Sequence, residues 1–127
     1  MAKARGFQRL RRFLRRFSLM PGTCRLTDIH FNPSDCHGCP NCCHPVSGPA
    51  ITGSSDVYIN SLPALRCDHM DMGVHCCCCG PNIWGTLVGS PDVIVNCHGI
   101  VRLNDVDWCC GGVGTMVTCS QDVIANG

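Results

Sequence analysis

The stretch GSSDVYIN at residues 53–60 returns twice in related forms, as GSPDVIVN at 89–96 and as CSQDVIAN at 119–126. The apolar and β-branched residues after the aspartate favour a short strand, and the serine, aspartate and asparagine favour turns. We therefore expect each copy to be a strand that enters a turn, with the apolar segment before it as the partner strand. One such hairpin is marginal in water, so the three copies are expected to share a core.

Other features recur in the same order with each copy. An arginine comes first, an acid or histidine stands three residues later, and a loop then leads to a pair of adjacent cysteines. The loops shorten from the first (28–42) through the second (69–78) to the third (105–109). A repeat of this kind is typical of units that cannot bury an apolar face alone. It predicts a mostly β structure with pseudo-threefold symmetry, in which the three loops emerge at one end.

Two sets of repeated charged residues are expected to be structural. The arginines recur in every unit, which favours ion pairs with the repeated aspartates or with neighbouring acids. They are Arg25, Arg66 and Arg102. Repetition favours turn capping, and not catalysis, for the aspartates Asp56, Asp92 and Asp122.

The composition divides the chain into two parts. Seven of the ten basic residues lie in the first 16 positions, whereas residues from 23 onward hold three arginines and nine aspartates. We expect a basic amphipathic helix or tail at 1–22 and one small domain at 23–127. At this size, metals or disulfides commonly supplement the core, and the 14 cysteines offer both.

The N-terminal part has apolar and basic residues on opposite sides of a helix of 3.6 residues per turn. Such a helix could lie on an anionic membrane or dock on a partner, and a tail that orders only on binding is the alternative. The residues expected to make these contacts are Phe7, Arg9, Leu10, Arg12, Leu14, Arg16 and Phe17. No apolar stretch follows them, which predicts synthesis in the bacterial cytoplasm without a signal peptide.

The chain resembles the PAAR-repeat family. The resemblance is carried by GSSDVYINSLPALRCDH (53–69), GSPDVIVNCHGIVRLND (89–105) and SQDVIANG (120–127), and it covers about residues 24–127. PALR at 63–66 stands where the family has Pro-Ala-Ala-Arg, whereas GIVR at 99–102 departs from it. The resemblance implies a small conical β-structure that caps the trimeric β-helical spike of a contractile injection machine. Such machines include phage tails and type VI secretion systems.

The same resemblance implies further properties. It implies one copy of the chain per spike trimer, no catalytic centre, and a place in a virion baseplate or a secreted injection particle. It also implies one zinc or iron ion near the tip, bound by three histidines and a cysteine. On this basis the expected ligands are His44, His75 and Cys110, with His30 or His69 completing the set. Histidine and cysteine suit either metal, and binding would stiffen a tip too narrow for a core.

The remaining cysteines leave two alternatives open. CHGCPNCCH at 36–44 has a knuckle-like spacing that could bind a second ion, and the cysteines could instead form disulfides. The candidates are Cys36, Cys39, Cys42, Cys43, Cys76, Cys77, Cys78, Cys79 and Cys109. Adjacent cysteines fit disulfide geometry poorly, which favours pairs between units, among Cys43, Cys79 and Cys110. Small buried apolar roles are expected for Cys24, Cys67, Cys97 and Cys119.

Two other function classes compete with a spike tip. A zinc hydrolase would need an open metal position and a general base, but the chain has no glutamate and no H-E-x-x-H motif. A zinc protein could instead bind nucleic acid through the arginine-rich N-terminus. The acidic composition after residue 23 and the scarcity of aromatic residues argue against nucleic acid as a partner.

Overall fold

The computed structural model describes residues 21–36, 43–77, 80–109 and 112–126, and all ten elements in these ranges are β-strands. The prediction of a mostly β structure is confirmed. The predicted helix, with its membrane- or partner-binding residues between Phe7 and Phe17, lies outside the described residues. No helix in the described part has the length and apolar character needed to cross a bilayer.

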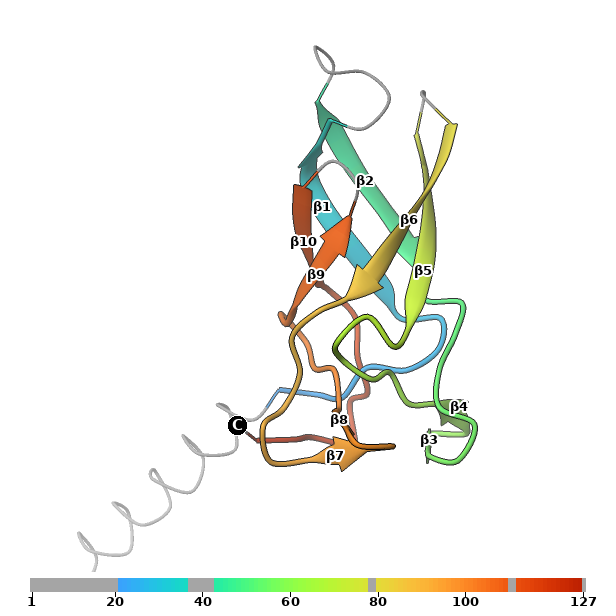
Figure 1. Cartoon of the computed structure of the whole chain (residues 1–127), viewed down its shortest axis with the longest axis vertical. Helices are drawn as coiled ribbons and strands as arrows, with labels where there is room; N and C mark the ends of the chain where they lie inside the picture. Colours follow the sequence, from blue (N-terminus) through green and yellow to red (C-terminus); the bar gives the residue numbers. More distant parts are fainter. Residues whose placement is uncertain (1–20, 37–42, 78–79, 110–111, 127) are drawn as a thin grey trace, which may run out of the picture.

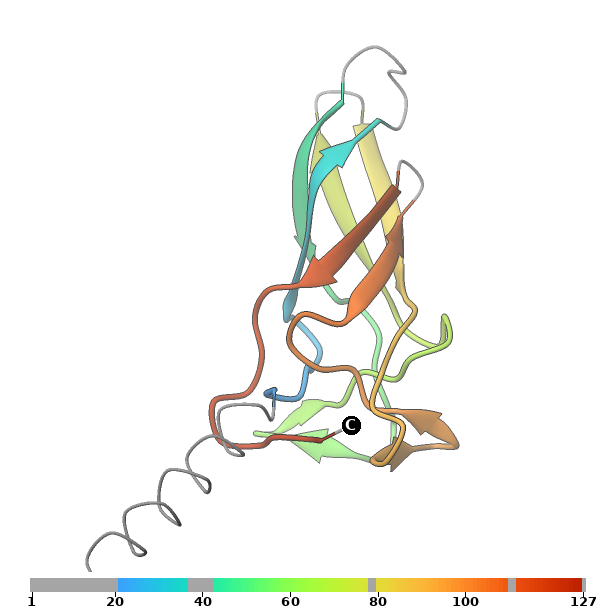
Figure 2. The ribbon, with the colours of Figure 1, turned by 90° about the vertical axis from the view of Figure 1, so that its left-hand side faces the viewer.

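Three long hairpins form one antiparallel sheet of six strands. The strands pair in the order β2-β1-β10-β9-β6-β5. The hairpins comprise β1 (Ile29–Asp35) with β2 (His44–Pro49), β5 (Met72–Cys77) with β6 (Gly80–Thr86), and β9 (Val106–Cys109) with β10 (Gly112–Met116). The ends of the three hairpins point to the same end of the molecule (Figures 1 and 2), as the loop pattern predicted.

The sheet curls until its two outer strands meet. Ala50, just after β2, forms an antiparallel bridge with Gly73 of β5. Gly48 of β2 lies so close to β5 that a Cβ there would overlap the carbonyl oxygen of Val74. Glycine is therefore required at this close approach, and the sheet is nearly closed around its interior.

Two of the three repeated motifs form shorter hairpins at the broader end of the molecule (Figure 1). β3 (Tyr58–Ile59) pairs with β4 (Leu62–Pro63), and β7 (Ile94–Val95) pairs with β8 (His98–Gly99). The expectation of a strand entering a turn is confirmed for these two copies, but the partner follows the motif and does not precede it. The reason is the turn: Asn60 and Asn96, like the residue after each, have positive φ angles of 49–68°. Asparagine tolerates this conformation, which is typical of two-residue hairpin turns. In the third copy Ile124 forms an isolated antiparallel bridge with Gly22 in place of a hairpin.

A ring of backbone hydrogen bonds joins the three units. The residues that precede the repeated arginines are Cys24, Leu65 and Val101, all fully buried. The N–H of Cys24 donates to Val101 at 2.8 Å, that of Val101 donates to Leu65 at 3.0 Å, and that of Leu65 donates to Cys24 at 3.1 Å. Each unit therefore donates a hydrogen bond to one neighbouring unit and accepts one from the other. All three bonds of the ring are between units.

Three serines of the motif lock the units in the same cyclic way. Each hydroxyl accepts hydrogen bonds from the backbone N–H groups two and three residues further on, at 3.0–3.2 Å. The same hydroxyl donates at 2.5 Å to an oxygen of an asparagine in another unit: Ser54 to Asn96, Ser90 to Asn126, and Ser120 to Asn60. The serines, and not the aspartates as predicted, thus cap the turns, because they stand two and three residues before the N–H groups that they bind. Asp56 and Asp122 instead accept hydrogen bonds from the side chains of Asn96 and Asn60.

The repeated arginines pair with acids, as the repetition predicted. In each pair the guanidinium binds both carboxylate oxygens, and the arginine backbone N–H binds one of them as well. The pairs are Arg25–Asp28, Arg66–Asp71 and Arg102–Asp105. In the second unit the aspartate partner stands five residues after the arginine, whereas in the other two it stands three residues after it. The strand that follows, β5, therefore begins two residues later relative to its arginine.

Candidate metal centre

Three side chains from three different hairpins converge inside the curled sheet. His30 comes from β1, His75 from β5 and Cys109 from β9, and each lies on the first strand of its hairpin. One potential ligand atom of each lies within 4.8 Å of the others, and all three residues are buried. The sheet therefore brings one donor from each repeat unit to a single point.

Strand alternation explains why these residues face inward. Side chains two residues apart point to the same side of a strand. In each unit the count starts at the aspartate that binds the repeated arginine, which is Asp28, Asp71 or Asp105. The two inward-facing residues stand two and four positions after it. The first inward layer is His30, Gly73 and Asp107, and the second is Asn32, His75 and Cys109.

His30 has the environment of a metal-ligating histidine. Its Nδ1 lies 3.1 Å from Oδ2 of Asp107, and both side chains are completely buried. Its ring stacks on Trp84 at a centroid distance of 4.7 Å and on His75 at 5.7 Å. Its Nε2 is buried and makes no hydrogen bond. A buried polar atom without a partner is costly, and a metal ion at Nε2 would supply the missing partner.

The other two donors also have polar neighbours. Nε2 of His75 lies 3.6 Å from Oδ2 of Asp35, and both side chains are buried. The thiol of Cys109 lies 3.1 Å from Nδ2 of Asn32 and 3.2 Å from the carbonyl oxygen of Gly112. Metal-bound histidine typically donates a hydrogen bond to a carboxylate through its second nitrogen. His30 has such a partner in Asp107, and His75 lies close to a carboxylate, that of Asp35.

One carboxylate of the centre has a shifted pKa. Burial raises the pKa of Asp107, and the hydrogen bond from His30 acts in the opposite direction. A buried anion of this kind favours a cation nearby. Two imidazoles and a thiol are a donor set that borderline metal ions such as Zn²⁺ accept. The cluster of His30, His75 and Cys109 could therefore hold a metal ion.

The structure brings together only part of the predicted ligand set. His30 and His75 belong to the cluster, and the cysteine in it is Cys109, which the sequence assigned to a second site or a disulfide. Cys110 lies outside the described residues. His44 is the first residue of β2 and pairs with Asp35. The ring of His69 meets that of Trp108 edge-on, with 6.1 Å between the ring centroids. Neither histidine belongs to the cluster. Strand alternation was the signal for Cys109, because it continues the inward series from Asp107.

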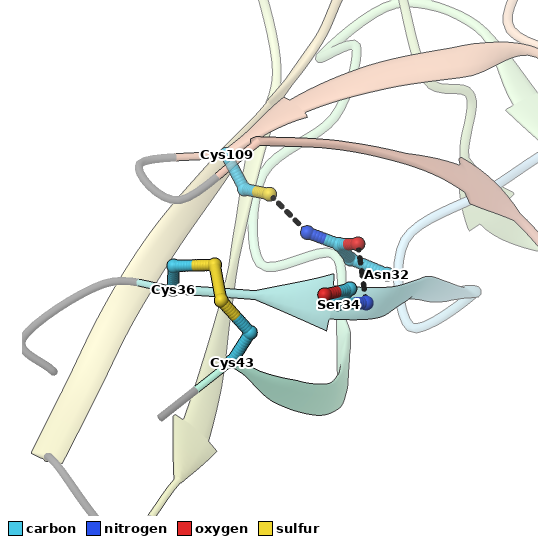
Figure 3. Close-up of a disulfide and its surroundings, with 5 residues drawn as sticks. All are labelled: Asn32, Ser34, Cys36, Cys43 and Cys109. Carbon is cyan, nitrogen blue, oxygen red and sulfur yellow. Dashed lines mark hydrogen bonds between the residues drawn. A yellow bond between two sulfur atoms is a disulfide. The ribbon is translucent and has the colours of Figure 1, made fainter. Parts of the chain in front are cut away.

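The first hairpin carries a disulfide between Cys36 and Cys43 (Figure 3). The predicted pairing of Cys43 with another unit is therefore wrong. The β1–β2 register pairs Asp35 with His44, so the next two residues outward face each other across the same hairpin. The cysteines whose placement or side chains the structure does not describe are Cys39, Cys42, Cys76, Cys77, Cys78 and Cys79.

The four isolated cysteines differ from one another. Cys24 and Cys67 are buried free thiols, as predicted, whereas Cys119 is half-buried and Cys97 is exposed. The prediction of a buried apolar role is wrong for Cys97, because it occupies the second position of the β7–β8 turn with a φ of 68°.

Comparison with known proteins adds no assignment. No protein-family model matches the chain, and no curated protein matches it.

Proposed function

We propose that this protein is the metal-stiffened tip of a contractile injection machine. In this function the conical three-unit body caps a trimeric β-helical spike, one copy per trimer, and passes first through the target envelope. It would act in a phage-tail baseplate or in a secreted injection particle.

The observation that carries the proposal is the distribution of charge across the curled sheet. The six strands of the curled sheet contain two acidic residues, Asp35 and Asp107, both fully buried, and no arginine or lysine. The outer surface instead exposes large apolar side chains, among them Phe31, Met72, Ile83, Trp108 and Val113. A soluble antiparallel sheet commonly has polar residues on its outer face, whereas here the outer face is largely apolar although apolar residues such as Trp84 and Met116 also fill the interior. An uncharged outer face lowers the cost of passing through hydrocarbon.

The broader end supports attachment to a threefold partner. Tyr58, Ile94 and Ile124 occupy the same motif position in the three units, and Tyr58 and Ile94 are 58% and 55% exposed. The next residue of each motif points into a small core formed by Ile59, Ala64, Val95, Ile100 and Ala125. Two of the three motif positions are exposed at this end, whereas Ile124 is half-buried. A monomer with internal threefold repetition fits a threefold partner without any further subunit.

The metal centre supplies rigidity in this proposal. It would hold zinc or iron through His30, His75 and Cys109, and so cross-link the first strands of the three hairpins. The burial of all three residues supports a structural role over hydrolysis, because a substrate would have to reach a metal inside the sheet.

Binding to a trimeric β-helical spike protein from the same genome tests the proposal. Native mass spectrometry should detect one tip per three spike chains. Ile94→Asp at the broader end should abolish the complex, whereas Val113→Asp, an equal change on the outer face of β10, should preserve it. Failure of the wild-type protein to bind, or equal loss with both variants, would overturn the spike-tip function.

Contact with a membrane is tested separately by fluorescence. Trp84→Phe leaves Trp108, on the outer face, as the remaining tryptophan. Quencher-bearing phosphatidylglycerol vesicles should quench this residue when the tip–spike complex is driven onto them by centrifugation, and Val113→Asp should reduce the quenching. Emission that stays unquenched would contradict lipid contact by the outer face.

A further inference from the structure

We infer that Asp107 and Asn32 are positioning residues of the metal centre, and that the first and third units each orient the ligand supplied by the other. This inference rests on the metal centre proposed above. It concerns residues that contact the candidate ligands and would not bind the ion themselves, which the repeat brings into place but which no ligand motif in the sequence indicates.

The arrangement follows from the two inward layers. In the first layer the ligand His30 of unit one faces Asp107 of unit three, at 3.1 Å. In the second layer the ligand Cys109 of unit three faces Asn32 of unit one, also at 3.1 Å. Units one and three therefore each contribute a ligand in one layer and, in the other layer, the residue that contacts the other unit's ligand.

Asp107 determines which nitrogen of His30 is available. A carboxylate accepts a hydrogen bond and cannot donate one when ionised, so its contact with Nδ1 places the imidazole proton there. The lone pair is then on Nε2, the buried atom that makes no hydrogen bond. This pairing fixes both the tautomer and the ring orientation, and it raises the basicity of the ligating nitrogen.

Asn32 acts on the sulfur of Cys109, and its orientation is fixed by its own backbone. Its Oδ1 accepts the backbone N–H of Ser34 at 3.0 Å, so its Nδ2 is the end that faces Sγ of Cys109 (Figure 3). An amide N–H donates to a thiolate and stabilises its negative charge. Asn32 is buried, so water does not compete for this contact.

The second unit contributes space in place of a side chain. It has Gly73 in the first layer, and a Cβ at that position would overlap the ring of Trp84. The indole fills this space and stacks on His30. The imidazole is therefore held at its edge by Asp107 and across its face by Trp84.

Cobalt titration of the metal-free protein tests the inference, with the intensity and energy of the thiolate-to-cobalt charge-transfer band as readouts. Asp107→Asn should weaken Co²⁺ binding by about 10–100-fold. Asp92→Asn, which removes the same charge from an exposed position in the β7 motif, should leave binding unchanged. Asn32→Leu should weaken binding and move the band to lower energy, because the thiolate loses a stabilising donor. Asn32→Ser, whose hydroxyl is too short to reach the sulfur, tests the same contact with a polar side chain in place of an apolar one.

The outcomes separate the two proposals. Absence of a thiolate band in the wild-type protein would overturn the metal centre itself. The other decisive outcome is a normal band in the wild-type protein, with Asp107→Asn and both Asn32 variants binding Co²⁺ equally well at the same band energy. This outcome would leave the metal centre intact and would overturn the positioning roles.

Discussion

Replacing the serines of the repeated motif tests the cyclic locking of the three units. Each serine hydroxyl makes three hydrogen bonds: it accepts two backbone N–H groups and donates to an asparagine oxygen in another unit. Ser54→Ala would leave these three groups without a partner in a site where the serine is only 1% exposed. At about 1 kcal/mol for each unsatisfied group, and with partial relief from water at the exposed turn, the loss of unfolding free energy is about 2–3 kcal/mol.

The threefold arrangement makes the prediction more demanding. Ser120→Ala removes the same contacts and should cost the same as Ser54→Ala. Ser90→Ala should cost slightly less, because Ser90 donates to the backbone carbonyl of Asn126, which also accepts from Arg102 at 3.2 Å. Distant sites usually add, so the triple variant should lose about 6–9 kcal/mol. That is comparable to the whole stability of a small domain, about 5–15 kcal/mol, and the triple variant should be largely unfolded.

Urea denaturation followed by tryptophan fluorescence at a fixed zinc concentration measures these differences. Ser47→Ala, on the exposed side of β2, is the matched control and should change stability by no more than about 0.5 kcal/mol. Single variants as stable as this control would refute the locking role. So would one variant that costs several times more than the other two, because the three sites would then not be equivalent.

Three further predictions concern the thiols and the seam of the sheet. Reduction of the Cys36–Cys43 disulfide should lower the unfolding free energy by about 2–3 kcal/mol, from the entropy of its short loop; urea denaturation with and without reductant measures this loss, and an unchanged midpoint contradicts it. Iodoacetamide at mildly alkaline pH should label exposed Cys97 well before Cys24, because burial raises the pKa of the Cys24 thiol and leaves little reactive thiolate; peptide mass spectrometry detects the order, and prompt labelling of Cys24 contradicts it. Gly48→Ala should separate β2 from β5, which would lower both the thermal midpoint and the cobalt affinity, and unchanged values would contradict the tight seam.

The repeat was enough to predict the β class, the three units and the common end of the loops. These properties depend on local patterns: the turn-forming asparagines, the β-branched residues before them, and the regular spacing of the arginines. The paired strand was predicted wrongly because the turn follows the motif. Only the positive φ angles at Asn60 and Asn96 reveal this.

The candidate metal ligands depended on information that local patterns do not contain. Cys109 joins the cluster through the register of β9, in which Asp107 and Cys109 share the inner side. The disulfide required the β1–β2 register, which contains an irregularity between Asn32 and Asp35. Such registers are set by contacts across the sheet, so composition and spacing could supply only the list of candidates.

The cyclic bonding between units also has a consequence for synthesis. Thr23, near the start of the described chain, can donate its backbone N–H only after Val123 is available, because the acceptor is the Val123 carbonyl. The first unit also lacks the partner of Asn60 until Ser120 is present. At about 5–20 residues per second, a ribosome needs roughly 5–20 s to make the hundred residues between them. The first unit can form its own hairpins early, but its bonds to the third unit have to wait until the last motif has been synthesised.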